Sequence, residues 1–299
     1  MTDPKRLLAE YRRDGFVVVP PMTPHEIWGP LTEELPAVLA EEGPQRFFEE
    51  DGTTVRAVYG LHRRGGPWQA LAEASPLTAL ARLLLGEDMY VYQWKVNPKA
   101  ARHGDRWQWH RDFDFWRAAD GMRRPAALTA AVFLDEVTEE NGPLRLVPGT
   151  HTERPADAAP AGNGGPAEGG EGDWAWITSS RNAYALPDPS TEELARTRGV
   201  HEATGPAGTA VLFHGNLVHS SGPNRSTHAR TLALISYNAV SNAPPADHPA
   251  ARRDLFVNHD AKPLAVGFNL DQTDSGRRPG RGAPSVRPVR RRPGPGAPR

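Results

Sequence analysis

The sequence predicts a mainly β fold with flanking helices, and two observations lead to this prediction. From residue 89 to residue 237, short apolar segments alternate with turns rich in glycine, proline and asparagine, a pattern typical of a β-sandwich or jelly roll. Before residue 89, segments with helix-start signals are interleaved with short strands, which indicates helices packed outside the sheets. The chain has 299 residues, of which 38% are hydrophobic, and this is enough for one large domain of this kind.

The residues before 89 are expected to form helices and two strands. Asp3-Pro4 and Thr23-Pro24-His25-Glu26 are helix starts, because each combines a capping side chain with proline at the first helical position. The second of these helices is expected to run to about Glu42. A further helix is expected over 75–85, ended by Gly86, and the two strands are expected at 15–20 and 55–59.

The remaining strands are expected at 90–97, 107–112, 128–134, 144–147, 209–213 and 231–237. A short helix capped by Ser190 is expected before the last two. Residues 156–172 are almost entirely Ala, Gly, Pro, Asp and Glu, so we expect a mobile loop over one rim of the barrel, anchored by Trp174 and Trp176. The predicted organisation is a single domain over 1–273 with a mobile insert at 152–173, followed by a disordered tail at 274–299.

Composition and charge exclude several classes of function. There are no cysteines, so disulfides, thiolate metal sites and a cysteine nucleophile are excluded. Between Arg277 and the C-terminus there are eight arginines and no acid; removing their charge from the net −1 leaves −9 for the rest of the chain, which argues against a nucleic-acid partner. No apolar run approaches the length of a membrane span and the first residues do not resemble a signal peptide, so we expect a cytoplasmic protein with no membrane partner. Its oligomeric state stays open.

One stretch, from Trp107 to Trp116, has the alternation of a half-buried strand and contains a pair of metal-ligand side chains. On such a strand His110 and Asp112 point to the same face. With a second histidine they would form the two-His-one-carboxylate triad of non-haem Fe(II) oxygenases. The pairs His103-Gly-Asp105 and His151-Thr-Glu153 have the same spacing, but the first lies in a loop without alternation.

The second histidine has two candidates, His214 and His219, and each has an arginine eleven residues further on. Arg230 follows His219 and opens an apolar strand, so its side chain can point into a barrel and bind an acidic cosubstrate. Arg225 follows His214 but lies in the turn Gly222-Pro-Asn-Arg-Ser226, where we expect it to be solvated. The pair of His219 and Arg230 is therefore preferred, and His214 is expected to be structural.

The motifs together resemble a known family, the phytanoyl-CoA dioxygenase superfamily of Fe(II)/2-oxoglutarate oxygenases. The resemblance rests on Trp109-His-Arg-Asp-Phe-Asp-Phe-Trp116, Asp120-Gly-Met122, Asn141-Gly-Pro143, Val147-Pro-Gly-Thr-His151 and the eleven-residue step from His219 to Arg230. Within the superfamily the chain is similar to bacterial amino-acid hydroxylases, namely the leucine 5-hydroxylase of griselimycin biosynthesis and ectoine hydroxylase. The first likeness includes the segments 50–59 and 237–244. The resemblance implies a double-stranded β-helix core of the jelly-roll, cupin-like type.

The resemblance also implies roles for individual residues. His110, Asp112 and His219 become the iron ligands, and Arg230 becomes the partner of the 2-oxoglutarate carboxylate. Polar residues expected at the cosubstrate pocket are Gln93, Asn97, Ser221 and Thr129.

Substrate contacts are expected from a further group of residues. Trp116 matches an aromatic residue at the substrate pocket of ectoine hydroxylase. Thr129 and Leu234 fall where that enzyme has a serine and a phenylalanine, and the missing phenylalanine argues against ectoine itself. Arg56, Tyr59 and Arg117 are expected polar contacts for a charged substrate.

The function implied is decarboxylation of 2-oxoglutarate coupled to hydroxylation of an unactivated C–H bond, with Fe(II) as cofactor and O2 as cosubstrate. Asp112 favours hydroxylation, because halogenases of this superfamily lack the carboxylate. The expected substrate is a free amino acid or amino-acid-like zwitterion in natural-product biosynthesis. A carrier-tethered amino acid or a terpenoid-like substrate is the alternative within this chemistry, and a non-catalytic jelly-roll metal-binding protein is the alternative outside it.

Overall fold

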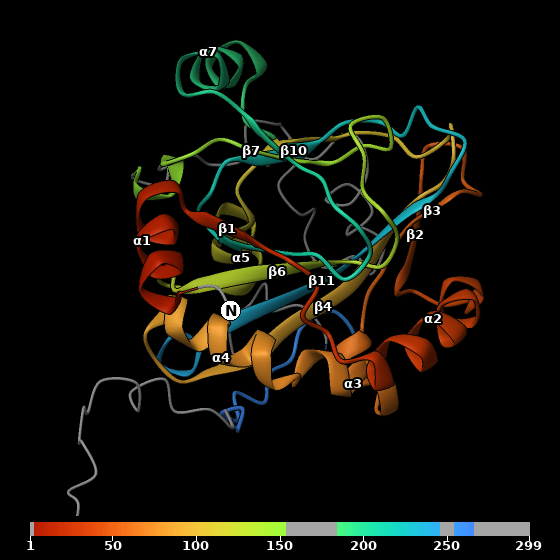
Figure 1. Ribbon diagram of the computed structural model, residues 1–299, viewed down its shortest axis with the longest axis horizontal. Helices are drawn as coiled ribbons and strands as arrows, with labels where there is room; N and C mark the ends of the chain where they lie inside the picture. The colour runs from red at the N-terminus through yellow and green to blue at the C-terminus, as the bar shows by residue number, and fades with distance from the viewer. Residues whose placement is uncertain (1–2, 154–183, 246–253, 266–299) are drawn as a thin grey trace, which may run out of the picture. The chain divides into compact units, whose positions relative to one another are not determined.

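The computed structural model describes residues 3–153, 184–245 and 254–265, and they form a sandwich of two antiparallel sheets with helices packed outside it (Figure 1). The prediction of a mainly β fold with flanking helices is confirmed. The expected mobile loop at 156–172 with Trp174 and Trp176, and the expected tail at 274–299, lie outside the described residues, as does most of the expected insert at 152–173.

The larger sheet has seven described strands in the order β1-β9-β6-β11-β4-β3-β2. Its two longest strands, β4 and β11, pair from Met89 opposite Ala239 to Lys99 opposite Arg230. The strands of this sheet are β1 (Phe16–Val19), β2 (Arg46–Phe48), β3 (Val55–Val58), β4 (Met89–Lys99), β6 (Ala127–Phe133), β9 (Ala210–His214) and β11 (Arg230–Ala239).

The smaller sheet has four described strands in the order β5-β10-β7-β8. They are β5 (Trp107–His110), β7 (Leu144–Leu146), β8 (His201–Ala203) and β10 (His219–Ser221). In Figure 1, β7 and β10 face β1, β6 and β11 across the interior of the sandwich. A hydrophobic cluster joins the two layers: Phe133, Phe213 and Leu232 from the large sheet meet Leu144 and Leu146 from the small one.

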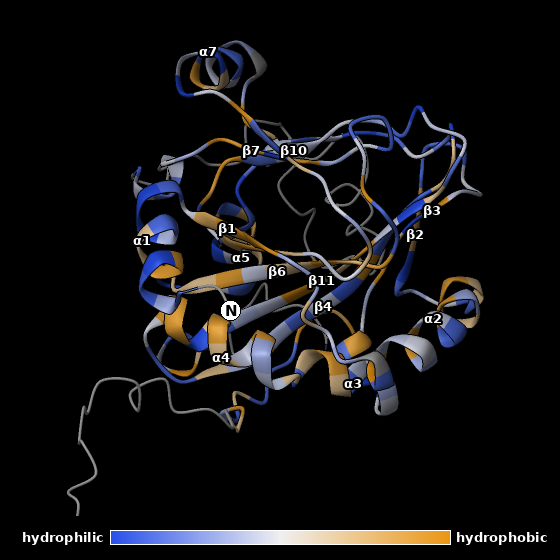
Figure 2. Cartoon of the chain, in the orientation of Figure 1, coloured by the Kyte–Doolittle hydropathy of each residue, from blue (hydrophilic) through white to orange (hydrophobic). Residues whose placement is uncertain are grey.

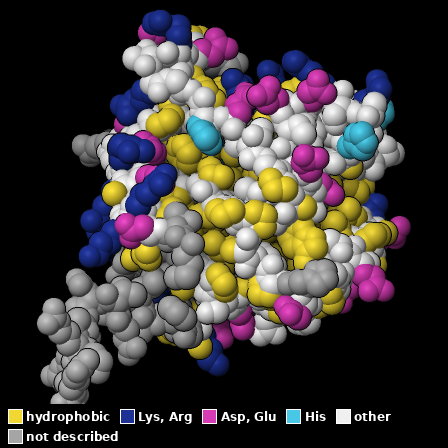
Figure 3. Space-filling view, in the orientation of Figure 1, with side chains coloured by type: hydrophobic (Ala, Val, Ile, Leu, Met, Phe, Trp, Pro, Cys, Tyr) yellow, Lys and Arg dark blue, Asp and Glu magenta, His cyan; other side chains and the backbone are white. Residues whose placement is uncertain are grey.

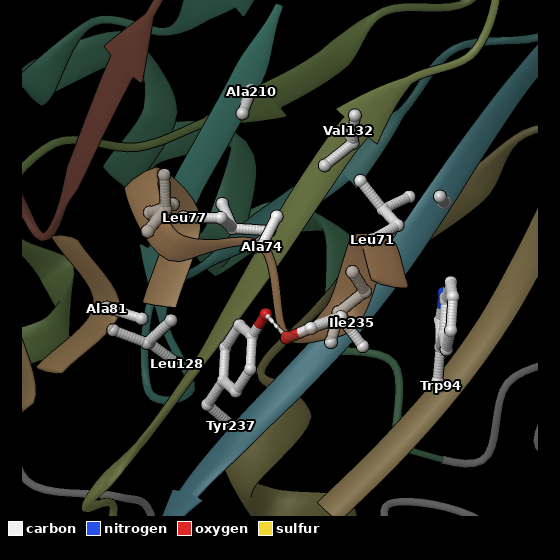
Figure 4. Close-up of a cluster of buried hydrophobic side chains, with 14 of the residues drawn as sticks. Leu71, Ala74, Leu77, Ala81, Trp94, Leu128, Val132, Ala210, Ile235 and Tyr237 are labelled. Carbon is white, nitrogen blue, oxygen red and sulfur yellow. Dashed lines mark hydrogen bonds between the residues drawn. The ribbon is translucent and has the colours of Figure 1, made fainter. Parts of the chain in front are cut away.

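Helices cover the outer face of the large sheet (Figure 1), as the helix-start signals before residue 89 predict. They are α1 (Pro4–Asp14), α2 (His25–Ala40), α3 (Gly66–Ala72) and α4 (Ser75–Leu85). Figure 2 shows hydrophobic residues along β1 and β6 and in α4, where these elements meet. In the close-up of this core the hydroxyl of Tyr237 on β11 donates to the Ala72 carbonyl at 2.7 Å, so even the polar atom of a buried side chain is satisfied (Figure 4).

Helix α1 has one apolar face, which packs on the sheet, and one basic face, which is exposed. Leu7 and Tyr11 are buried against the sheet. Its basic residues face outward, and Figure 3 shows Lys and Arg side chains gathered along the edge that α1 forms, while hydrophobic side chains occupy the middle of the same view. The helix ends at Gly15, whose φ of 84° and backbone N–H donated to Tyr11 form a glycine C-cap.

Strand residues alternate between the two faces of the large sheet. On β11, Ala233, Ile235 and Tyr237 belong to the core beneath the helices. Leu232, Leu234 and Ser236 instead face the interior of the sandwich, where they line a cavity. The period-two side-chain pattern of a strand therefore lets β11 contribute to the core and to the cavity at once.

The structure corrects the expected strand at 107–112. Strand β5 ends at His110, and Asp112 is the first residue of helix α5 (Asp112–Asp120). Arg111 is the extended N-cap, and Asp112 and Asp114 occupy the first turn, where unpaired backbone N–H groups favour carboxylates. The Phe113 N–H donates to the Gly215 carbonyl at 2.8 Å, which anchors the helix start. The buried residues Phe113, Trp116, Ala119 and Asp120 have helical, not strand, spacing.

Two helix boundaries also differ from those predicted. Helix α2 starts at His25 with Pro24 at the N-cap, so the Thr23 side chain does not cap it, and it ends at Ala40, not near Glu42. Helix α7 (Asp188–Arg198) starts before the predicted cap. The Ser190 hydroxyl donates back to the Pro187 carbonyl at 3.1 Å, because at this position the first turn has already formed.

Three further helical turns complete the described elements: Leu61–Arg63, Thr150–Thr152 and Val240–Asn242. None of the helices among the described residues combines the length and the apolar composition that a membrane span requires.

His214, at the end of β9, lies in a small aromatic cluster. Its ring centroid is 5.4 Å from that of His151 and 6.1 Å from that of Tyr11. Its Nδ1 accepts a hydrogen bond from the Asn216 N–H at 3.0 Å. Burial, together with the neighbouring His151, lowers the pKa of His214 to about 4. His214 therefore has structural contacts of its own, as the sequence predicts.

The lowered pKa of His214 makes stability depend on pH. In the unfolded chain this histidine takes up a proton near pH 6.5, whereas in the folded protein it stays neutral until about pH 4. The contribution of neutral His214 to the free energy of unfolding is therefore fully present above pH 6.5 and is lost as the pH falls toward 4. Between pH 7.5 and 5.5 the loss is about 1.4 kcal/mol. Urea unfolding at both pH values is expected to show a shallower pH dependence for His214→Gln than for the wild type. The exposed control His103→Gln is expected to keep the wild-type slope.

Candidate metal centre and cosubstrate pocket

Two histidines meet across the small sheet. His110 ends β5, His219 begins β10, and the two are paired residues of the antiparallel ladder. Their ring centroids are 4.2 Å apart. His219 is 5% exposed, and the His110 side chain is 14% exposed, so both rings lie in the interior of the sandwich.

Backbone carbonyls orient both rings in the same way. The Nδ1 of His110 lies 2.7 Å from the Gln108 carbonyl oxygen, and the Nδ1 of His219 lies 2.9 Å from that of Leu217. A carbonyl only accepts, so Nδ1 carries the hydrogen in each ring and the lone pair of the neutral imidazole is on Nε2. Burial, and then the neighbouring His219, lowers the pKa of His110 to about 3, so this ring is neutral at physiological pH.

Asp112 directs a carboxylate oxygen at both Nε2 atoms. Its Oδ1 lies 3.7 Å from Nε2 of His110 and 3.9 Å from Nε2 of His219. Burial acts to raise the pKa of Asp112, but electrostatic interactions with His219, His110 and Lys95 and the hydrogen bond from Thr129 outweigh it, so the pKa lies below its usual value. The position at the start of α5 also favours the ionised form.

These three side chains fit a metal ion. Their ligand atoms all lie within 4.8 Å of one another, and no other such group of His, Asp or Glu occurs among the described residues. Two lone pairs and a carboxylate oxygen converge with no hydrogen between them, an arrangement that a cation stabilises. Two imidazoles and one carboxylate on one side of a metal leave adjacent positions open, which is the ligand set of non-haem Fe(II) oxygenases.

A cavity between the sheets opens beside the three side chains. Its lining includes His110, Asp112 and His219, and five other predicted site residues: Asn97, Thr129, Ser221, Arg230 and Leu234. The remaining lining residues are Lys95, Trp107, Leu144, Phe213, Ser220, Leu232 and Ser236.

Arg230 supplies a buried positive charge to this cavity. It is 1% exposed and donates a hydrogen bond to the Gly142 carbonyl. Burial lowers the pKa of Arg230 to about 9, which still leaves it charged at neutral pH. Its Nε, the Oδ1 of Asn97 and the Oγ of Ser220 are buried and have no hydrogen-bond partner in the described protein. Buried polar atoms are almost always paired, so these three atoms indicate a polar ligand: Arg230 Nε and Ser220 Oγ can donate to an anion, whereas Asn97 Oδ1 accepts from a donor.

Arg56 and Tyr59 lie behind the cavity lining. The Arg56 guanidinium donates to Glu49 at 2.5 Å and stacks 3.9 Å above the Trp107 ring. The Tyr59 hydroxyl accepts a hydrogen bond from the Lys95 Nζ at 3.5 Å. Both residues therefore contact lining residues, Trp107 and Lys95, and are not among the lining residues themselves.

Gln93, Trp116 and Arg117 are also absent from the lining of this cavity. The Gln93 amide donates to the Phe256 carbonyl at 3.4 Å. Trp116 is 1% exposed and packs edge-on against Tyr92 at 5.6 Å, within a core cluster under α5. Arg117 lies in the last turn of α5, and its positive charge acts to lower the pKa of Asp114.

Lys95 is the main lining residue that sequence reasoning missed. It lies on β4 between Gln93 and Asn97, so all three share the inward face of the strand. The Lys95 Nζ is 5.2 Å from the centre of the Tyr59 ring and 5.8 Å from that of the Trp107 ring. Its charge helps to lower the pKa of both His110 and Asp112. The period-two relation to Gln93 and Asn97 is the signal that could have identified it.

Comparison with known proteins identifies the family. The profile of the phytanoyl-CoA dioxygenase (PhyH) family matches residues 11–232. The chain belongs to the phytanoyl-CoA dioxygenase family. The resemblance found in the sequence motifs is thus confirmed, and the protein is a dioxygenase of the Fe(II)/2-oxoglutarate class that those motifs indicate.

Relatives within this dioxygenase family include two kinds of hydroxylase. The chain is 40% identical over 259 residues to L-proline trans-4-hydroxylase of Streptomyces griseoviridis, covering 85% of this chain and 92% of the relative. It is 32% identical over 250 residues to ectoine dioxygenase of Sphingopyxis alaskensis, covering 79% and 76%.

Solved structures of the second relative share the fold. EctD from S. alaskensis, in a structure with 2-oxoglutarate and 5-hydroxyectoine, superposes with a TM-score of 0.71 at 27% identity, over 87% of this chain and 86% of that one. A structure of EctD with bound Fe gives a TM-score of 0.70 at 28% identity, over 87% and 86%. The core of this dioxygenase is therefore a cupin-like double-stranded β-helix, as the motifs imply.

Replacing Asp112 tests the metal centre. Asp112→Ala removes the only anionic ligand of the group of three and is expected to weaken binding of Fe(II), or of Co(II) as an air-stable substitute, by about 100-fold or more. Isothermal titration of the metal-free protein measures this. Asp114→Ala is the matched control, because Asp114 lies in the same helical turn but outside the group of three. Equal metal affinity of the two variants would remove Asp112 from the site.

Proposed function

We propose that the protein hydroxylates a free amino acid or an amino-acid-like zwitterion, using Fe(II), 2-oxoglutarate and O2. The observation that carries the proposal is the composition of one cavity: the three metal-ligand side chains, the buried Arg230 and a second cation, Lys95. His110, Asp112 and His219 would hold the iron. Together with 2-oxoglutarate, the iron supplies the oxidation of an unactivated C–H bond.

Arg230 would bind the distal carboxylate of 2-oxoglutarate. A planar guanidinium suits a carboxylate, and in this cavity burial strengthens the pair because little water competes for it. The unpaired Ser220 hydroxyl would donate a hydrogen bond to the same cosubstrate. A dianion also offsets the cost of burying Arg230, whose guanidinium donates to the Gly142 carbonyl among the described residues.

Lys95 would bind the carboxylate of the substrate. Lys95 is paired with Leu234 and Arg230 with Lys99, so the two residues lie four positions apart along the β4–β11 ladder, roughly 13 Å between their backbone positions. They can therefore serve different carboxylates. Proline and ectoine, the compounds named for the relatives, each contain a carboxylate. The carboxylate of Asp112 supports hydroxylation in place of halogenation.

Lys95 also favours a free substrate over the alternatives. An amino acid tethered to a carrier protein as a thioester has lost its carboxylate charge, and a terpenoid-like hydrocarbon has none to offer. Neither would give the Lys95 ammonium a substrate carboxylate to pair with. A free amino acid pairs with it and keeps the buried charges balanced.

The first test is succinate release from 2-oxoglutarate with Fe(II), ascorbate and air, in the presence of free L-amino acids, cyclic imino acids or ectoine. One compound is expected to stimulate succinate release and to gain about 16 daltons, the mass of one oxygen atom. Stimulation by a carrier-tethered amino acid and by no free one would contradict the proposed substrate class. Metal binding without any succinate release would favour a non-catalytic protein.

Lys95→Met tests the substrate contact with the compound found in this way. Loss of a charged hydrogen bond is expected to raise the substrate KM about 10- to 100-fold. The cosubstrate KM is expected to stay within about threefold of the wild-type value, and Lys95→Arg is expected to retain most of the substrate affinity. The methyl ester of the substrate should be equally poor with the wild type and with Lys95→Met. An unchanged substrate KM in Lys95→Met would contradict the assignment.

A further inference from the structure

Thr129 connects the metal-ligand carboxylate to a second hydroxyl. It lies on β6 and is 2% exposed. Its Oγ1 donates to Oδ2 of Asp112 at 3.3 Å and lies 3.0 Å from Oγ of Ser236. Ser236, also 2% exposed, is the residue paired with Thr129 across β6 and β11. The strand register therefore holds the two hydroxyls side by side.

The directions of these hydrogen bonds follow from counting hydrogens. An ionised carboxylate only accepts, and a hydroxyl has one hydrogen to donate. When Thr129 donates to Asp112, the hydrogen between Thr129 and Ser236 has to come from Ser236. The result is an ordered chain in which Ser236 donates to Thr129 and Thr129 donates to Asp112. Neither valine at 129 nor alanine at 236 can take part in it.

The chain of hydroxyls distinguishes the two oxygens of Asp112. Oδ1 faces Nε2 of His110 and of His219, at 3.7 and 3.9 Å, and is placed to bind a metal. Oδ2 accepts the hydrogen bond from the Thr129 hydroxyl. Without that bond the carboxylate could rotate and bind the metal through both oxygens, which would fill a position that a chelating cosubstrate or O2 needs.

We propose that Thr129, supported by Ser236, is a positioning residue that holds Asp112 as a ligand through one oxygen and so keeps a coordination position free. The proposal rests on the metal site of the proposed function but not on its substrate. It differs from the contact with cosubstrate or substrate that the family resemblance implies for Thr129, because it acts through Asp112. Partners of metal ligands commonly control affinity in this way.

The test is metal binding in the absence of both 2-oxoglutarate and substrate. Co(II) is titrated anaerobically into the metal-free protein, and its affinity and visible spectrum are recorded. Thr129→Val keeps the branched shape and is expected to change the visible spectrum of bound Co(II), because Asp112 can then bind the metal through both oxygens. Thr129→Ser, which restores the hydroxyl, is expected to return the spectrum to that of the wild type. Ser236→Ala is expected to change the spectrum less than Thr129→Val.

Thr78→Val is the matched control. Thr78 on α4 is 1% exposed and donates its hydroxyl to the Ala74 carbonyl at 3.2 Å, so the variant also loses a buried hydroxyl bond, but outside the cavity. Its Co(II) affinity and spectrum are expected to match the wild type. If Thr129→Val does not fold, the comparison of Ser236→Ala with Thr78→Val decides the question in the same way.

An unchanged Co(II) spectrum in Thr129→Val would overturn the proposal, even if hydroxylation were lost, because the residue would then contact cosubstrate or substrate directly. A further anaerobic titration of the Co(II)-loaded protein with 2-oxoglutarate is expected to show weaker binding to Thr129→Val than to the wild type. Failure of the proposed function has a separate signature: the wild type would hydroxylate none of the free substrates, while these metal titrations would still report on Thr129.

Discussion

The pairing of β5 with β10 is the interaction on which the candidate site depends. It places His110 directly opposite His219, although the two are more than one hundred residues apart in the chain. β10 also pairs with β7 on its other side, where His219 lies opposite Leu146, so the position of this histidine is determined by two neighbours. Each ring then donates to a carbonyl two residues before it, which leaves both Nε2 atoms directed toward the same point.

The third side chain of the candidate metal site, Asp112, depends on a change from strand to helix for its position. A continued strand would carry Asp112 about 6.6 Å along its axis from His110. The turn into α5, anchored by the Phe113 N–H on the Gly215 carbonyl, instead brings the carboxylate back toward both imidazoles. The helix start also favours its negative charge, so one local feature controls both the position and the ionisation of Asp112.

Alternation along β4 and β11 explains how a core and a charged cavity share two strands. Trp94 and Val96 belong to the core under the helices, while Lys95 and Asn97 line the cavity. Two buried or half-buried cations in one cavity would repel each other and cost free energy without anions nearby. The same charges therefore make the cavity suited to carboxylates, and the unpaired Nε of Arg230 agrees with this.

Local pattern and the spacing within motifs were enough to predict the family, most strands, the candidate metal-ligand residues and the preference for His219 with Arg230. It misplaced Asp112 on a strand, since the alternation of Trp107–Trp116 fits a strand and does not reveal that a carbonyl from residue 215 anchors a helix there. The folded chain was needed to show that Arg56 contacts Glu49 and Trp107, that Lys95 lines the cavity and that Thr129 donates to Asp112. Each of these contacts joins different elements, and the partner of a side chain across a sheet or between layers is set by register and packing, which no local pattern contains.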